Sequence, residues 1–465
     1  MADLFSLLGQ AGASLSAHRT ASATASHNLQ NSGTAGYARQ SVTLGAVVPA
    51  DMRAGMYIGR GAMALGVTQA RSRFIEAQLP DLLGRAAFAT AQSTALRQVP
   101  ALDLEGPLSP SSALGQFQAS LTALGQNPGN LPLREGVLAS ARQLGLAFNR
   151  TAETLDAALR GLDAQVSGYK GEINQLASEV ARLNREIRTA RASGGEPNDL
   201  LDARLRAQDK LAELTGAQVV PDGSGDANLR LPSGGALVAG DVAGRIVFQP
   251  DPQNGGHLAP MLQTASGALQ PARPGGTVGG LLEARDGALR QSQRQLDEVA
   301  HGFATAVNAA HDAGVGLDGQ GNRPLFDVGA TVEGAASRFG ISAAVGSDPN
   351  RLAAASGTGT LPGGAGALYA MIAAADAPLG SGASASTSLA RLTTAFGGAT
   401  RQAESLAAHE GTLLTQTLSA RESVSGVSVD EELLNLTRSQ RAYEAVLKVI
   451  TTTNEMLDSL LRLKS

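Results

Sequence analysis

Hydrophobic side chains recur at alternating steps of three and four residues near both ends of this sequence. The C-terminal positions are Leu433, Leu436, Gln440, Tyr443, Leu447, Ile450, Asn454, Leu457 and Leu461. The N-terminal positions are Leu4, Leu8, Ala11, Leu15, His18, Ser22, Ala25 and Leu29. Steps that average about 3.5 residues place such side chains on one face of a helix, as in a coiled coil. We therefore predict that the two terminal helices pair and that these positions form an assembly interface.

The longest regular pattern lies in the middle of the chain, from about residue 133 to residue 192. Its positions are Leu155, Leu159, Leu162, Val166, Tyr169, Ile173, Leu176, Val180, Leu183 and Ile187. About sixty helical residues that rise ~1.5 Å each give a rod of roughly 90 Å. A second helix, with Leu201, Leu205, Leu211 and Leu214, is expected to return along the rod. We interpret this central pattern as internal helix packing.

Shorter helices and strands are predicted before the rod. A helix over residues 3–30 leads into a turn-rich segment, followed by β-prone pieces at Val42–Leu44 and Met56–Ile58. Helical spacing resumes near Phe74. A further amphipathic helix carries Leu114, Phe117, Leu121 and Leu124 and ends at Asn127-Pro128-Gly129, a strong breaker.

In the second half of the chain, β-prone runs alternate with segments that have helical spacing. The β-prone runs are Ala217–Val220, Asn228–Leu231, Ala236–Val238 and Arg245–Phe248, separated by Gly, Pro and Asp. Helical spacing returns with Leu282, Arg285, Leu289, Ser292, Leu296, Val299 and Phe303. Glycine-rich loops and short strands are expected over 314–366 and a linker over 380–388, before two final helices at about 389–422 and 429–463. Ser428 and Glu431 have the spacing of a capping box at the last helix.

These patterns predict a mainly α fold with a smaller β part. The subunit is expected to be elongated and multidomain, with paired terminal helices, a long central helical rod and an inserted β module. The predicted terminal helical domain is 1–40 with 425–465. The predicted helical bundle is 41–215 with 277–313 and 389–424, and the β-rich and loop-rich outer module is 216–276 with 314–388.

Composition supports an assembly of long helices more than a compact enzyme. The 465 residues are enough for about two to four domains. Aromatic residues make up only 3%, Trp is absent, and Ala, Gly and Ser recur throughout. Small residues favour close helix–helix contact, but they leave each helix with a thin apolar stripe.

Charge and sorting signals exclude several classes of partner. The net charge is −4, and the Lys and Arg residues are dispersed, so we expect no nucleic-acid partner. No stretch approaches about 18 uninterrupted apolar residues, so we expect no membrane insertion. The first residues lack the features of a cleavable secretory signal, and export would need a dedicated route. The absence of cysteine excludes disulfides and thiolate metal sites.

No catalytic or cofactor constellation emerges from the residues, and we expect neither an enzyme nor a metal or cofactor site. The six histidines are scattered, and His409-Glu410 lacks the second His of a zinc-protease motif. Asp318–Asn322 lacks the alternating acids of a calcium loop. Gly59–Ala64 matches GxGxxA only by count, and Asp430–Glu432 suit a helix start.

Two stretches of the sequence resemble the shared signatures of flagellar rod, hook and hook-associated proteins. The first is Asn28–Gln40, with a signature turn at Asn31, Gly33, Gly36 and Tyr37. Ala35 stands where the family usually has Pro, which removes a preset φ angle from the turn. The second resemblance covers Ser425–Leu436, Gln440–Glu444 and Lys448–Asp458.

Further stretches are similar to the hook-associated members in particular. These are Gly279–Asp286, Leu296–Ala300, Asn308–His311, Gly314–Phe326, the heptads at 150–190 and Pro197–Arg204. Longer relatives carry an additional β domain beyond the position of Phe326. Here only about fifteen residues separate Phe326 from Ile341, so that domain is expected to be absent or minimal.

The resemblance implies a secreted structural subunit of the bacterial flagellum, exported through the flagellar type III channel. It would form a ring of identical subunits at the distal end of the hook and join the hook to the filament. Its implied partners are the hook protein, the second hook–filament junction protein and a flagellar export chaperone. The alternatives are a hook or distal rod protein, or an exported wall-cutting enzyme whose catalytic groups would lie in 216–390.

Overall fold

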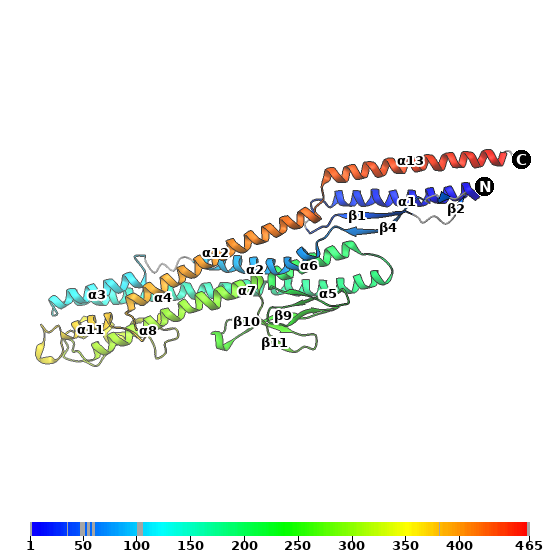
Figure 1. Ribbon diagram of the computed structural model, residues 1–465. Coiled ribbons are helices and arrows are strands. Elements are labelled where there is room, and N and C mark those ends of the chain that lie inside the picture. The colour runs from blue at the N-terminus through cyan, green and yellow to red at the C-terminus, as the bar shows by residue number, and fades with distance from the viewer. Residues whose placement is uncertain are drawn as a thin grey trace.

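The computed structural model describes residues 2–34, 36–46, 52–53, 56–57, 61–99, 106–380 and 382–462. It is an elongated, mainly helical molecule, and both ends of the chain lie at the same extremity (Figure 1). Small antiparallel sheets are set along the helices. The predicted fold class, mainly α with a smaller β part, is confirmed.

The two outermost helices run side by side, as predicted. Helix α1 (Ala2–Gln30) packs along α13 (Val429–Arg462), and the pair projects beyond the helical body (Figure 1). Strands β1 (Gln40–Ala46) and β4 (Ala62–Gln69) form an antiparallel ribbon that also contacts α1. The short strands β2 (Met52–Arg53) and β3 (Met56–Tyr57) pair with each other. Ile58 and Gly59, parts of two sequence motifs, lie outside the described residues.

The body is built from long antiparallel helices. Helices α2 (Arg73–Gln98) and α3 (Pro110–Gln126) precede the rod. The predicted rod is two consecutive helices, α4 (Leu131–Gly168) and α5 (Lys170–Ala192), which meet at Tyr169 between Gly168 and Gly171. Helix α6 (Asn198–Thr215) returns along α5. Tyr169 itself keeps a right-handed helical backbone, so the pattern crosses the junction without losing its register.

The central heptad positions line the core. Eight of the ten are buried, and Tyr169 and Leu176 are half-buried. This confirms internal helix packing for residues 150–190. Five phenylalanines make the densest aromatic cluster, with neighbouring ring centroids 4.9–6.4 Å apart. They are Phe117, Phe148, Phe303, Phe326 and Phe339.

Two small sheets form the first β region. Strands β5 (Gln218–Pro221), β6 (Ala227–Arg230), β7 (Ala236–Ala239) and β8 (Val242–Ala243) make one sheet. Strands β9 (Arg245–Pro250), β10 (Leu258–Gln263) and β11 (Leu269–Pro271) make the other. All four predicted β-prone runs are strands. Strand β10 was missed because Pro260 lowers its strand propensity.

The glycine-rich region after α8 (Arg290–Asp312) lies at the opposite extremity from the α1–α13 pair (Figure 1). It contains β12 (Phe326–Asp327), α9 (Ala335–Arg338), β13 (Gly340–Ile341), α10 (Ala343–Gly346) and α11 (Gly366–Asp376). Sequence analysis did not predict α11. The strands of 218–271 lie instead beside α5, so the two parts of the predicted outer module occupy different places (Figure 1). The predicted domain division stays a prediction.

Helix α12 (Ala385–Ser425) begins inside the segment expected to be a linker. Ser384 caps it by accepting a hydrogen bond from the Thr387 amide, 3.3 Å away. The linker prediction was therefore too long by four residues at its end. Serine, alanine and glycine are common in linkers, but here a serine supplies the N-cap and alanine is a strong helix former.

Strands β12 and β13 pair directly at the position where longer relatives were expected to carry an additional β domain. Phe326 pairs with Ile341, and Asp327 pairs with Gly340. Asn308 of α8 holds this pair, because its amide group accepts from the Leu325 and Phe326 amides and donates to the Phe326 carbonyl. A connection of twelve residues therefore joins two hydrogen-bonded strands.

A buried arginine docks the second β sheet on the body. Helix α7 (Gly276–Glu283) continues into a π-helical segment (Ala284–Leu289) and then into α8 (Arg290–Asp312). Arg285 in the π-helical segment is fully buried and pairs with Asp163 of α4. It also donates to the Leu258 carbonyl of β10 at 2.7 Å. The Asp163 carboxylate binds His257 at 2.6 Å, so one acidic group joins α4 to the sheet.

Replacing Arg285 with Leu removes the cation that contacts both Asp163 of α4 and the Leu258 carbonyl of β10. The Asp163 carboxylate is mostly buried, and breaking a buried pair costs about 3–5 kcal/mol because the remaining charge loses its partner. We expect the free energy of unfolding to fall by about 3 kcal/mol in a urea titration followed by far-UV circular dichroism. Arg294→Leu, at an exposed position of α8, should change it little. Equal stabilities of the two variants would contradict the docking role.

Candidate assembly interface and the joint below it

The predicted seam of α13 divides into two rows in the folded chain. One row is half-buried and consists of Leu436, Tyr443, Ile450 and Leu457. The other row is exposed and consists of Leu433, Gln440, Leu447, Asn454 and Leu461. The half-buried row lies next to a second covered row, Glu432, Ser439, Val446 and Thr453. The contact with α1 therefore uses the predicted heptad period but only four of the nine predicted positions.

A 3.5-residue period does not say which of two neighbouring rows turns inward. The sequence pattern assigned the exposed row and the half-buried row to one seam, and it left out the second covered row, which contains Glu432 and Thr453. Glu432 can be covered because α1 and the segment after it supply hydrogen-bond partners for its carboxylate. That information is absent from the pattern of α13 alone.

Helix α1 has small side chains where it is most tightly covered. Ala11, Ala17 and Ala25 are buried. The predicted positions Leu4, Leu8, Leu15 and Leu29, together with His18 and Ser22, are half-buried. Small residues let neighbouring elements approach closely, which is consistent with α1 lying against both α13 and the β1–β4 ribbon. Phe5 remains 62% exposed.

The outer face of α13 keeps a group of large apolar side chains in solvent. Its members, which we call the outer α13 face, are Val429, Leu433, Leu434, Leu447, Val449, Met456, Leu460 and Leu461. Each is at least 38% exposed. Single exposed apolar residues are ordinary, but a concentration of them on one helix is typical of an interaction surface. The chain alone therefore leaves this face without a partner among its described residues.

Asn28 ties three elements together at the base of the helix pair. Its amide nitrogen donates to the Gln40 carbonyl at 2.7 Å and to Glu432 Oε2 at 3.0 Å. Its carbonyl oxygen accepts from the Gln40 amide at 2.9 Å and from the Tyr37 hydroxyl at 2.8 Å. Asn28 is only 1% exposed, so α1, β1 and α13 are joined through one buried amide.

Arg39 connects the same turn to the start of α13. Its Nε donates to Glu432 at 2.8 Å, and its Nη1 lies 3.1 Å from Glu431. Its backbone amide donates to the Ser425 carbonyl at the end of α12, 2.9 Å away. Ser428 accepts from the Glu431 amide at 3.4 Å, as the capping box requires. The Glu431 carboxylate, however, pairs with Arg39.

The signature turn is held by its own hydrogen bonds. The Asn31 side chain donates to the His27 carbonyl, and the Asn31 carbonyl accepts from the Thr34 amide. Gly36 has φ +75, where a side chain is strained, while Gly33 is exposed. The Tyr37 hydroxyl also contacts His27 Nδ1 at 3.1 Å, and burial raises the Tyr37 pKa well above its usual range. Ala35 lies outside the described residues.

A buried ionic cluster lies below this turn, between α2, α6 and α12. Arg71 donates to Asp202 at 2.7 Å and to Glu76 at 3.0 Å. Arg421 of α12 donates to the same Glu76 at 3.1 Å and to Asp209 at 3.4 Å. Arg71 also reaches the Gly36 carbonyl at 3.3 Å, so the cluster contacts the signature turn.

Sequence reasoning found the turn but missed most of this network. Asn28 and Arg39 stood inside the signature motif, and Glu432 stood in the acidic start of the last helix. Their proximity was not predictable, because Arg39 and Glu432 are 393 residues apart. Asp202 stood inside the Pro197–Arg204 stretch, but nothing in the sequence pattern pointed to the other members of the cluster, Arg71, Glu76, Asp209 and Arg421.

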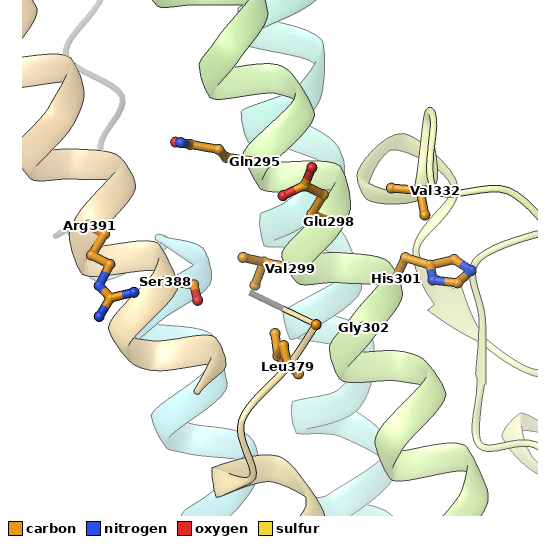
Figure 2. Close-up of a pocket in the computed structure, with 10 residues that line it drawn as sticks. Gln295, Glu298, Val299, His301, Gly302, Val332, Leu379, Ser388 and Arg391 are labelled. Carbon is orange, nitrogen blue, oxygen red and sulfur yellow. The ribbon is translucent and has the colours of Figure 1, made fainter. Parts of the chain in front are cut away.

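The exported-enzyme alternative needs a catalytic constellation within 216–390. A cavity of about 510 Å³ lies between α8 and α12, lined by Glu298, His301 and Arg391 among others. Figure 2 shows His301 beside Val332 and Arg391 across the cavity on α12, so these groups do not converge on one point. Over the described ranges, no group of three or more His, Cys, Asp or Glu residues could hold a metal ion. No described helix is long and apolar enough to cross a bilayer.

Replacing Asn28 with Ala should loosen the helix pair without unfolding the body. The change leaves Glu432 Oε2 and the Gln40 backbone without a buried partner, at a cost of about 1–3 kcal/mol. We expect amide exchange in α13 to become roughly tenfold faster, since about 1.4 kcal/mol corresponds to a factor of ten. Gln30→Ala, at an exposed position of α1, is the control. Unchanged exchange in α13 would rule out this joint.

Comparisons with known proteins match both the helical body and the C-terminal helix. Residues 105–326 match the family model described as the flagellar hook-associated protein FlgK helical domain. Residues 419–463 match the model of the flagellar basal body rod FlgEFG protein C-terminal region. The second match covers the end of α12 and all of α13.

Curated relatives cover most or all of the chain. Flagellar hook-associated protein 1 of Salmonella typhimurium is 31% identical over 339 residues, which are 70% of this chain and 60% of that protein. The protein of the same name from Escherichia coli K12 is 25% identical over 550 residues, 99% of this chain and 100% of that protein. The Bacillus subtilis protein is 26% identical over 507 residues, 99% and 98% of the two chains.

A solved structure, the flagellar hook junction protein FlgK from Burkholderia pseudomallei, is also similar. It has 27% sequence identity, a TM-score of 0.48, and coverage of 54% of this chain and 47% of that one. The chain thus spans 60% of the length of the Salmonella relative and the full length of the Escherichia coli relative. From the family models and curated relatives together, the chain belongs to the flagellar hook-associated protein 1 family.

Proposed function

We propose that this chain is a structural subunit of the bacterial flagellum, exported and assembled as a ring that joins the hook to the filament. The observation that carries the proposal is the α1–α13 pair, which projects from the body and leaves the outer α13 face in solvent. A neighbouring copy of the chain would cover that face. Family membership supports the same role, because the curated relatives bear the name hook-associated protein 1.

The partners follow from the place of the ring. Identical subunits contact each other through the predicted seam residues, and the exposed row from Leu433 to Leu461 is available for this contact. The hook protein lies below the ring, and the second hook–filament junction protein lies above it. A flagellar export chaperone accompanies the chain before export. The joint at Asn28 and Arg39 would transmit load between the inner helix pair and the outer body.

A hook or distal rod protein is the nearest alternative, since it shares the terminal signatures. The helical body argues against it. The core is a stack of long helices with α4 and α5 in series, and the region 105–326 matches a hook-associated helical domain. The exported-enzyme alternative has little support, because the polar groups of the α8–α12 cavity do not converge (Figure 2).

The body is smaller than in some relatives. The alignment to the Escherichia coli relative runs over 550 positions, more than the 465 residues of this chain, so it contains gaps on this side. We infer that part of the difference lies between Phe326 and Ile341, where β12 and β13 pair directly.

Deleting the gene for this chain should produce cells with complete hooks but no filaments. Flagellin should appear unpolymerised in the medium, because export continues while the platform for the filament is missing. Electron microscopy of the cells and an immunoblot of the medium measure both results. Truncated or missing hooks would indicate a rod or hook protein, and normal filaments would refute the proposed role.

Leu447→Asp, supplied to the deletion strain, should fail to restore filaments. Leu447 is 38% exposed in the single chain, so the carboxylate should leave the fold intact but place a charge in the subunit contact. Leu146→Asp, at a position of α4 that is 54% exposed, is the matched control and should restore filaments. Both variants should give the same circular dichroism spectrum as the parent. Restored filaments with Leu447→Asp would remove the seam from the assembly interface.

A further inference from the structure

The ionic cluster between α2, α6 and α12 lies at a mechanically sensitive place. Arg421 is one helical turn before Ser425, where α12 ends. A short connection, Gly426 to Ser428, then leads into α13. The C-terminal link between the helix pair and the body therefore passes through the last turns of α12, directly beside the cluster.

The cluster contains more acid than base. Three carboxylates, Glu76, Asp202 and Asp209, face two guanidinium groups, Arg71 and Arg421. One oxygen of each carboxylate is buried and without a hydrogen-bond partner among the described residues. Arg421 Nη2 is also buried and has no hydrogen-bond partner among the described residues. One additional proton would balance the charge and give a carboxyl group a donor.

Asp209 is the group best placed to take that proton. It faces Arg421 of α12, Glu76 of α2 and Arg71 just before α2. Burial is the main cause that raises its pKa to about 6; the nearby Glu76 charge contributes to this rise, and the Arg421 charge acts against it. The folded pKa exceeds the ordinary value of 3.8, so the folded state favours protonated Asp209. Ionisation of Asp209 therefore destabilises the folded state by its whole amount above about pH 6. This destabilisation decreases as the pH falls below about 6.

We propose that Asp209, Glu76 and Arg421 form a proton-tightened latch that holds the end of α12 against α2 and α6. In mild acid the latch is neutral overall and the end of α12 is held firmly. Above neutrality the third carboxylate is ionised, the cluster carries excess negative charge, and the end of α12 loosens. The α1–α13 pair then has more freedom to change its angle to the body. The latch is a property of the single chain and does not depend on the proposed role in the flagellum.

The latch can be tested by a distance measurement, because the chain contains no cysteine to interfere with labelling. Cysteines introduced by Gln78→Cys on α2 and Ser423→Cys on α12 replace exposed residues near Glu76 and Arg421. Nitroxide labels there report the separation of the two helices by pulsed electron spin resonance. We expect the distance distribution of the full chain to broaden as the pH rises from about 5 to about 8, with a midpoint near 6.

Asp209→Asn in the labelled chain should keep the narrow distribution at both pH values, because the amide cannot ionise. Asp156→Asn, at a partly exposed position of α4 whose carboxylate pairs with Arg160 of the same helix, should keep the response of the parent. Arg421→Gln should broaden the distribution at both pH values. A distribution of the parent that is independent of pH overturns the latch, and this holds even if a variant fails to fold. A pH response that survives Asp209→Asn overturns it as well.

Discussion

The arrangement of this molecule depends on a joint made of buried polar groups. Asn28 and Arg39 join α1, β1 and the start of α13 through Gln40 and Glu432. A directional network of this kind holds one geometry, because each buried donor or acceptor is costly when its partner is displaced. Apolar packing between small side chains would allow the helix pair to slide or rotate. The polar joint therefore defines how the projecting pair meets the body.

The body below the joint is stabilised in a different way. Its core is a continuous row of aliphatic side chains along α4 and α5, and five phenylalanines gather where α3, α4 and α8 meet β12. Buried arginines connect the loops and sheets to this core. Arg285 docks a sheet, and Arg134 binds the Pro128 and Leu352 carbonyls at the far extremity. Apolar helix packing supplies the stability of the body, and charged side chains decide where its irregular parts attach.

The helix pair and the body together suit a subunit that contacts neighbouring subunits and carries mechanical load. The helix pair offers an outer apolar face that a single chain leaves exposed, and the body has a continuous hydrophobic core along its length. A ring built from such subunits would carry load from one extremity to the other through the joint. The ionic cluster at Glu76 and Arg421 lies on that route, which is why its charge state matters for the angle between pair and body.

The heptad periods of this chain determined the long helices, the pairing of α1 with α13, and the buried positions of the central rod. Such features are local, because a helix turns by a fixed angle per residue and the period alone places side chains on a face. The signature turn was also readable, since Gly36 and Asn31 have local conformational roles. Family resemblance was visible at the same level, in short runs of sequence.

Tertiary structure decided which row of α13 turns toward α1, because both rows share one period and only the partners of Glu432 distinguish them. It also decided where the two parts of the predicted outer module lie and which charged residues form pairs. Arg39 pairs with Glu432, and Glu76 pairs with Arg421, although the members of each pair are hundreds of residues apart in the sequence. No periodicity encodes such contacts, because they depend on the path of the whole chain and on the burial that this path creates.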